Sequence, residues 1–368
     1  MSGRLLSEGT RRRDFETIAR VTEERGMALA TFGTTEAQGV GVDALAEDWE
    51  FALEVLAEMV LESTFPEDRL EWVKRQTLTE LGSLLDQGEL RTRRRFLHQL
   101  YHPHPYGRFP QGTPETVTAL TRQDCGSFHR QVLGWGGCLS VAGAIDEDRV
   151  QQHLEGLFEG LAGAPDSWPE VMEATGDGAD RQHESLPSGE QAHLFVGHRT
   201  VSRNHPDMPA LEVLGVVLGS GAGLSGRLPE RIREREGLAY HVEVATAAGA
   251  GIDAGRMAAY IGTTPAMVEK AEASVREELD RLLQEGITAT ELADAKAYLE
   301  GRDPFRRETG RQWADLLTEA VLYGIPVDRP EWVGEVLRDL DLKTVNEVAR
   351  RHLRPGDLRV TVGWPEKA

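Results

Sequence analysis

The sequence predicts an α+β protein built from two similar α/β halves. Three observations lead to this prediction: helical and strand-like patterns alternate along the chain, the length of 368 residues suits two domains, and the second part of the chain repeats the first. The composition is that of a globular protein, with 40% hydrophobic and 28% charged residues. Each half is therefore long enough to bury a core of its own.

The individual elements follow from the spacing of apolar residues. One helix is expected from about Glu47 to Leu61, and a second is expected to start near Pro66. Strands are expected at Cys138–Ile145 and in the segment AHLFVGH, which begins at Ala192. Residues 163–189 are polar and contain proline and glycine, so we interpret them as a linker.

The repeat rests on three pairs of similar segments that occur in the same order. Their offsets are nearly constant: 211 residues for ERGMAL and REGLAY, 222 for LEWVK and LADAK, and 220 for ALTRQDCGSFHRQVL and DLDLKTVNEVARRHL. The predicted organisation is a first half at 1–162, a linker at 163–189 and a second half at 190–368. By the same arithmetic the first copy would start roughly 20 to 30 residues before Met1. The first half is therefore expected to be incomplete at its N-terminus, with an unpaired sheet edge.

The charge and cysteine content exclude several classes of function. A net charge of −20 argues against nucleic acid or an anionic membrane as the main partner. No segment approaches the roughly 20 apolar residues of a membrane span, and no signal peptide follows Met1, so a cytoplasmic location is expected. Cys125 and Cys138 lack a metal-binding spacing, and both are expected to be ordinary buried or half-buried thiols.

Three motifs resemble the pitrilysin/insulinase/mitochondrial processing peptidase family. They are LLSEGT near the start, HPYGR followed by QGTPETVTALT, and GRLPERIREREGLAYHV in the second half. The resemblance covers nearly the whole chain. It implies two similar halves, each a mainly antiparallel sheet with helices on one side, and it implies that two such units close like a clamshell around a peptide.

The same resemblance implies that a zinc site has been lost. Active members carry H-x-x-E-H on the helix that ends in a turn like LLSEGT. In this register Gly3 stands at the position of the general base, Arg4 at the second histidine and Glu80 at the third ligand, while the first histidine would precede Met1. Glycine has no carboxylate and a guanidinium cannot bind zinc, so we expect no metal on this chain.

Glu80 stays open to more than one interpretation. It lies seven residues after Val73 and hence on the apolar face of its helix. It is either the solvent-exposed edge of that face or the partner of Arg4, which would then fill the vacated metal position. A zinc site built on this single carboxylate is the least favoured interpretation.

The second half retains an arginine and a tyrosine seven residues apart, Arg233 and Tyr240. In the family such a pair binds substrate and stabilises the negative charge that develops on the peptide carbonyl oxygen. The alternative is an ordinary arginine on a solvated helix and an ordinary strand tyrosine. YHPHPYGR and the glycine-rich Gly219–Arg227 are interpreted as a turn and as a flexible connection.

These observations favour a non-catalytic subunit of a zinc peptidase. Its expected partners are a zinc-bearing homologous subunit and a peptide substrate, in a hetero- or homodimer. Two alternatives stay open: a purely structural or peptide-binding paralogue, like the core subunits of respiratory complexes, and an incomplete gene for an active enzyme. Gly3 and Arg4 argue against the last of these.

Overall fold

The computed structural model of the protein describes residues 1–159, 170–221 and 225–366. The chain forms two compact units that are interleaved in sequence. The first contains residues 1–83, 109–171 and 309–318, and the second contains 84–108, 172–308 and 319–368. The predicted boundaries at 162 and 190 refer to the two copies of the sequence repeat, whereas the compact units are defined by contacts between residues. The repeat boundaries therefore stay a prediction.

The first unit combines a small sheet with a layer of helices. Strands β1 (Ala28–Gly33) and β2 (Gln38–Asp43) pair antiparallel over their whole length. The helices are η1 (Gly3–Leu5), α1 (Phe15–Glu23), η2 (Ala46–Asp48), α2 (Trp49–Leu61), α3 (Glu67–Asp86), α5 (Pro114–Ala119), α6 (Arg122–Gly134) and α7 (Glu147–Leu157). The expected helices at 47–61 and after Pro66 are therefore present as α2 and α3.

The second unit is organised around a five-stranded sheet in the order β3-β7-β4-β6-β5. Only the β3–β7 pair is parallel, so the expectation of a mainly antiparallel sheet is confirmed. The strands are β3 (Arg181–Leu186), β4 (Ala192–Arg199), β5 (Ala239–Ala248), β6 (Arg256–Thr263) and β7 (Arg359–Pro365). Strand β4 is the predicted segment AHLFVGH with one further residue.

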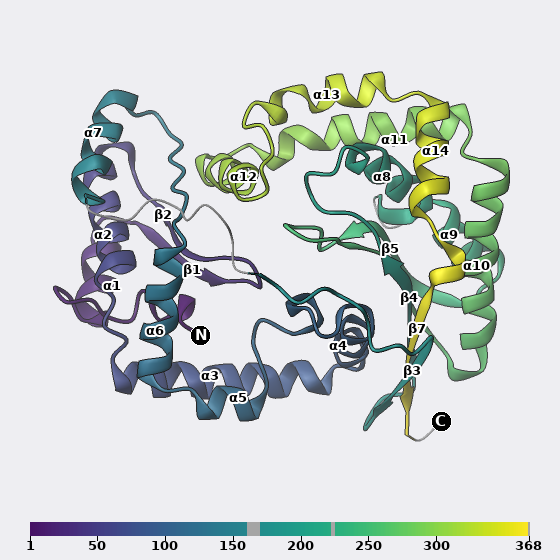
Figure 1. Cartoon of the computed structure of the whole chain (residues 1–368), viewed down its shortest axis with the longest axis horizontal. Coiled ribbons are helices and arrows are strands. Elements are labelled where there is room, and N and C mark those ends of the chain that lie inside the picture. The colour runs from purple at the N-terminus through teal and green to yellow at the C-terminus, as the bar shows by residue number, and fades with distance from the viewer. Residues whose placement is uncertain (160–169, 222–224, 367–368) are drawn as a thin grey trace. The chain divides into compact units, whose positions relative to one another are not determined.

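Most helices of this unit lie on one face of the sheet (Figure 1). They include α8 (Met208–Gly215), α9 (Arg227–Pro229), α10 (Val268–Glu285), α11 (Ala289–Arg302) and α14 (Leu342–His352). Helix α13 (Arg329–Asp339) packs on α8 and α11, and α12 (Gly310–Leu322) spans the boundary between the units. Short helical turns complete the chain: η3 (Pro105–Gly107), η4 (Val216–Ser220), η5 (Glu230–Arg235), η6 (Pro265–Met267), η7 (Asp303–Arg306) and η8 (Pro355–Asp357).

One helix, α4 (Gly88–Tyr101), covers the opposite face of this sheet. Side chains alternate across a strand, so Leu194 and Val196 enter the main core while Phe195 points to the other side. There the ring of Phe195 stacks on that of Phe96, with the centroids 5.5 Å apart. The sheet of the second unit is therefore buried on both faces.

Two predictions about local structure are wrong, the strand at Cys138–Ile145 and the burial of Cys138. Cys138–Ile145 forms no strand and Cys138 is exposed, because no described strand pairs its backbone with this apolar segment. The predicted linker contains β3. This strand is polar, so its composition does not predict a strand, and it is ordered by its pairing with β7. The rest of that linker, 163–169, lies outside the described residues.

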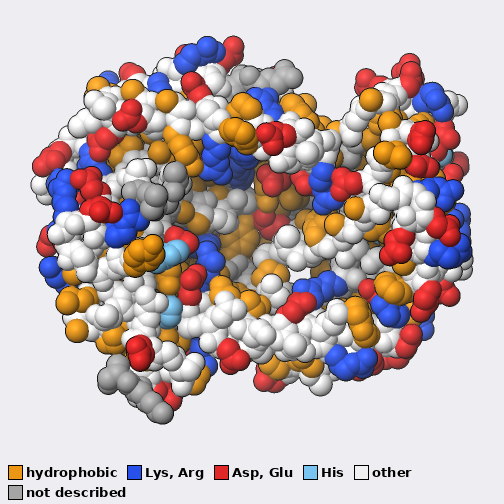
Figure 2. Space-filling view, turned by 180° about the vertical axis from the view of Figure 1, so that it is seen from behind, with side chains coloured by type: hydrophobic (Ala, Val, Ile, Leu, Met, Phe, Trp, Pro, Cys, Tyr) orange, Lys and Arg blue, Asp and Glu red, His pale blue; other side chains and the backbone are white. Residues whose placement is uncertain are grey.

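Charged side chains of both signs are interspersed on the face seen in Figure 2. Many charged side chains of the described residues form ion pairs, for example Arg91 with Glu184 at 2.6 Å and Arg227 with Glu291 at 2.6 Å. Within the described residues no helix is long and apolar enough to cross a membrane.

Candidate functional site

The predicted base position, Gly3, has no room for a side chain. It lies in η1, which is anchored by the fully buried Leu5 and the almost fully buried Leu6. A Cβ atom at Gly3 would lie 2.3 Å from the carbonyl oxygen of Phe32 in β1, well inside van der Waals contact. A glutamate at this position would therefore require the backbone of η1 or β1 to move.

Arg4 and Glu80 form the ion pair that one of the two interpretations of Glu80 proposed. The Nη2 atom of Arg4 lies 2.7 Å from Oε2 of Glu80, and its Nη1 donates to Oγ1 of Thr77 at 3.2 Å. Both charged side chains are partly exposed, at 38% and 46%, so water screens the pair. Glu80 is thus also a solvent-exposed residue at the edge of the apolar face, and the two interpretations of it are compatible.

These residues do not fit zinc. A guanidinium stands where a neutral imidazole is needed, it already engages the one carboxylate nearby, and Gly3 offers no ligand or base. We derive no metal chemistry from this chain. Whether Gly3, Arg4 and Glu80 descend from a zinc site stays a prediction.

The turn after η1 is held by buried polar groups that the sequence did not single out. Buried Glu58 on α2 accepts hydrogen bonds from Thr10 and Arg13. Gly9 has a φ of 152°, and a Cβ atom there would lie 2.9 Å from the Cγ of Pro66. The only signal in the sequence is the E-G-T turn itself, because Glu58 reads as one more polar residue of an amphipathic helix.

Glu8, in the same turn, is bound from α3. Its carboxylate accepts from Nε of Arg69 at 2.7 Å, and burial raises the pKa of Glu8 against the opposing effect of this arginine. The Arg69 guanidinium in turn lies 3.8 Å from the ring centroid of Phe15. This buried pair ties the start of the chain to α3.

Tyr240 is placed on the surface of the second unit by an irregularity in the sheet. It lies in β5, the last strand in the sheet order, and the pairing with β6 shifts between Ala239 and His241. Tyr240 is the extra residue of this bulge, and it is 90% exposed. Bulges of this kind re-aim a side chain and occur frequently beside active sites.

Arg233 lies in η5, just before β5. Its Nε donates to Oε1 of Glu234 at 2.8 Å. The turn is π-helical, a wider helical form that is frequent at functional sites. The turn is anchored by Ile232, whose side chain is fully buried in the main core.

A charge network attaches η5 to α10. Arg231 donates to Oε1 of Glu236 at 2.7 Å and also pairs with Glu277. Its Nη1 lies 3.7 Å from the buried Glu278, which Arg281 contacts at 2.6 Å. The flanking residues of Arg233 are therefore held by ion pairs to α10.

His104 in the YHPHPYGR segment is structural, as expected. Its Nε2 lies 3.0 Å from the Asp253 carboxylate, and its Nδ1 accepts from the Tyr106 amide at 3.1 Å. Both ring nitrogens are thus used to hold η3 against the β5–β6 connection.

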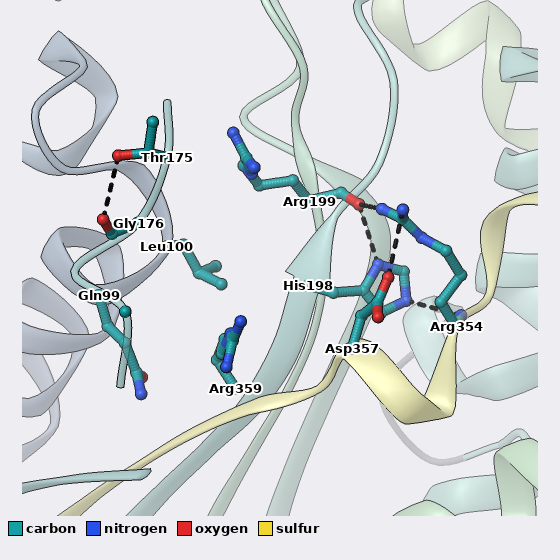
Figure 3. Close-up of a pocket in the computed structure, with 10 residues that line it drawn as sticks. Gln99, Leu100, Thr175, Gly176, His198, Arg199, Arg354, Asp357 and Arg359 are labelled. Atoms are coloured by element: carbon teal, nitrogen blue, oxygen red, sulfur yellow. Dashed lines mark hydrogen bonds and ion pairs between the residues drawn. The ribbon is translucent and has the colours of Figure 1, made fainter. Parts of the chain in front are cut away.

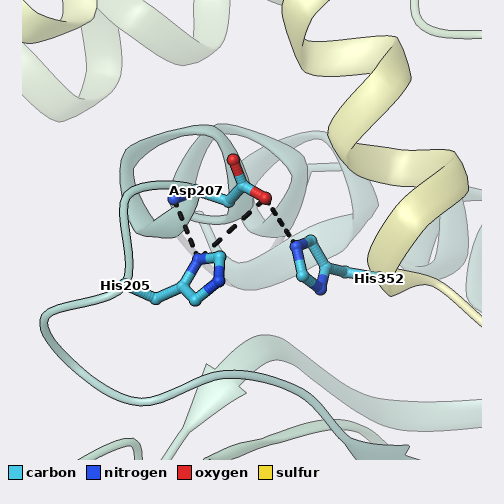
Figure 4. A group of neighbouring side chains, drawn as sticks. All are labelled: His205, Asp207 and His352. Carbon is cyan, nitrogen blue, oxygen red and sulfur yellow. Dashed lines mark hydrogen bonds and ion pairs between the residues drawn. The ribbon is translucent and has the colours of Figure 1, made fainter.

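Two further groups of polar residues stand out in the second unit. One is a pocket of about 240 Å³ between α4 and the sheet, lined on one side by His198, Arg199 and Arg354 (Figure 3). The other is a cluster of His205, Asp207 and His352 with metal-like ligand types (Figure 4).

The cluster of Figure 4 is already neutralised by protein groups. His352 Nε2 and Arg351 Nη1 contact Oδ2 of Asp207 at 2.6 and 2.5 Å, and they hold the pKa of Asp207 low although burial alone would raise it. His205 Nδ1 accepts from the Asp207 amide at 3.1 Å. A metal ion would have to displace the Arg351 guanidinium, so we interpret the cluster as a link between α8 and α14.

Comparison with known proteins agrees with the motifs. The family described as "Insulinase (Peptidase family M16)" matches residues 2–109, and the one described as "Peptidase M16 inactive domain" matches residues 120–299. An "Uncharacterized zinc protease" of Mycobacterium leprae is 30% identical over 351 residues, which cover 94% of this chain and 76% of that protein.

A second relative and a solved structure extend the comparison. A "Non-peptidase homolog" of Helicobacter pylori is 24% identical, and the match covers 97% of this chain and 82% of the relative. The crystal structure of a peptidase M16 inactive domain from Pseudomonas fluorescens superposes with a TM-score of 0.86 at 22% identity, covering 99% of this chain and 87% of that one. At this identity the superposition establishes the fold.

Proposed function

Since this chain belongs to the insulinase family of peptidases, family M16, we propose that it is a non-catalytic subunit of a zinc-dependent peptidase. It pairs with a zinc-bearing homologous subunit, and together the two enclose a peptide in a chamber. This chain supplies Arg233 and Tyr240 to substrate binding and to stabilisation of the transition state. The proposed compartment is the cytoplasm.

One observation carries the proposal: Tyr240 occupies a bulge and is 90% exposed, although a tyrosine normally buries most of its ring. Packing within the second unit does not explain this placement. A phenol donor and a guanidinium are suited to the negative charge that develops on a peptide carbonyl during hydrolysis. The misfit of Gly3 and Arg4 to zinc supports the assignment of the metal to a partner.

The experiment combines this chain with a homologue that carries H-x-x-E-H. The pure chain is expected to bind no stoichiometric zinc and to cleave no peptide, whereas the mixture cleaves peptides. Tyr240→Phe is expected to lower kcat of the mixture by about 10²–10³, which is typical for the loss of one oxyanion donor. Tyr298→Phe, a half-buried tyrosine on α11, is the matched control and leaves kcat unchanged.

Two results would contradict the proposal. One is chelator-sensitive cleavage by the pure chain, and the other is a mixture in which Tyr240→Phe and Tyr298→Phe behave alike. The second result favours a purely structural or peptide-binding paralogue. The Arg233–Glu234 contact of 2.8 Å favours that alternative, because it occupies the guanidinium within the chain itself.

A further inference from the structure

The pocket of Figure 3 is enclosed by four segments of the second unit. Gln99 and Leu100 come from α4, Thr175 and Gly176 from the segment before β3, His198 and Arg199 from the end of β4, and Arg354 and Arg359 from the chain around η8. Gln99, Leu100 and His198 are buried, whereas Arg354 is exposed. The cavity is therefore a built feature of the fold.

Positive charge exceeds negative charge in this pocket. Three arginines, Arg199, Arg354 and Arg359, line it together with a single carboxylate, Asp357. Arg354 pairs with Asp357 at 3.2 Å, and Arg359 pairs with Asp180. Arg199 donates to the carbonyl oxygen of Ala174, and within the described residues its guanidinium makes no ion pair with a carboxylate.

A second arginine adds to the charge beside Arg199. Arg256 on β6 is the cross-strand partner of Arg199, and like charges at such positions repel each other. Burial lowers the pKa of Arg256, and its Nη1 donates to the carbonyl oxygen of Ala248 at 3.3 Å. Within the described residues, this end of the β4–β6 pair thus carries two cations that form no ion pair with a carboxylate.

His198 fixes the arrangement without adding charge. Its Nε2 accepts from the Arg354 amide at 3.1 Å, so the proton is on Nδ1, which donates to the Arg199 carbonyl oxygen at 2.9 Å. Nη2 of Arg354 donates to that same oxygen at 2.9 Å. The imidazole therefore locks the end of β4 to η8, and it holds the backbones of Arg199 and Arg354 in place.

We propose that this pocket binds a phosphate dianion, either free or as part of a small molecule, with the guanidiniums of Arg199 and Arg354 as its main ligands. Within the described residues Arg199 and its cross-strand neighbour Arg256 pair with no carboxylate, so a dianion would balance their two charges. The planar guanidinium fork matches phosphate oxygens. The volume of about 240 Å³ is roughly that of eight water molecules at about 30 Å³ each, so there is room for more than one phosphate group.

The test measures binding to the full chain at constant ionic strength. Inorganic phosphate, glycerol phosphate and tripolyphosphate are titrated by calorimetry, with chloride and acetate as reference anions. Binding is expected to saturate at one site and to raise the melting temperature, as any ligand of the native state does. Arg199→Gln and Arg354→Gln are each expected to weaken binding at least tenfold.

Arg338→Gln is the control, since it removes the same charge from an exposed position on α13. It is expected to bind like the parent chain. Tighter binding of glycerol phosphate than of phosphate identifies a phosphorylated small molecule, and equal binding identifies free phosphate. The proposal is overturned if no anion binds above the acetate reference, or if folded Arg199→Gln and Arg354→Gln bind as tightly as Arg338→Gln.

Discussion

The guanidinium of Arg4 lies 2.7 Å from the carboxylate of Glu80, across 76 residues of sequence. The motif register predicts these as the positions of the second and third zinc ligands. In the structure the Arg4 cation and the Glu80 carboxylate pair with each other. The contact is solvent-accessible, so it neutralises Glu80 without adding much to stability.

Adding a single methyl group at Gly3 should destabilise the first unit. The Cβ of Gly3→Ala would lie 2.3 Å from the Phe32 carbonyl oxygen, and such overpacking costs about 1–3 kcal/mol. Denaturant unfolding measures the change. The matched control is Gly82→Ala on α3, where a Cβ meets nothing within 4 Å and helix propensity predicts a gain of about 0.5–1 kcal/mol. Equal effects of the two substitutions would contradict the steric account.

Two ion pairs of the first unit, Arg4–Glu80 and Arg69–Glu8, should differ in strength. Glu80→Gln removes a pair whose carboxylate side chain is 46% exposed, so the free energy of unfolding is expected to change by about 1 kcal/mol or less. Glu8→Gln leaves Arg69 without its anion in a mostly buried site, where the carboxylate is 8% exposed, and is expected to cost about 2–4 kcal/mol. Thermal unfolding of both variants tests the order, and a larger loss for Glu80→Gln would refute it.

Stability should fall as the pH drops below about 6.5, the ordinary pKa of histidine. Burial lowers the pKa of His129 and of His198, so the unfolded chain takes up protons that the native chain does not. The free energy of unfolding then rises with pH, and the contribution of these residues is fully present above pH 6.5. The raised pKa of Glu8 acts in the opposite direction at lower pH.

Urea unfolding at pH 7.5, 6.5 and 5.5 tests this dependence. Each midpoint urea concentration is multiplied by the same m value, the slope of the unfolding free energy against urea concentration, to give the free energy of unfolding. A free energy of unfolding that stays constant or increases between pH 7.5 and 5.5 would show that the buried histidines do not control stability in this range.

Elements of both units could be predicted from the sequence where they carry their own signals. The strand at Ala192 is an apolar run, and the helices at 47–61 and after Pro66 have clear helical periodicity. The strand expected at Cys138–Ile145 shows the limit of such reasoning. An apolar segment becomes a strand only when another strand accepts its hydrogen bonds, and that partner cannot be read from the segment itself.

In the candidate site, too, some features follow from residue type alone and others depend on the tertiary structure. The identities of Gly3, Arg4, Glu80, Arg233 and Tyr240 are enough to show which chemistry is possible, because glycine and a guanidinium cannot serve a zinc ion in any fold. Residue type therefore determined which chemistry Gly3 and Arg4 cannot supply. Tertiary structure decided the rest: the contact that excludes a side chain at Gly3, the bulge that exposes Tyr240, and the pocket at Arg199. Each of these depends on backbone segments that are distant in sequence, and their approach is determined by packing and strand register, which no local pattern encodes.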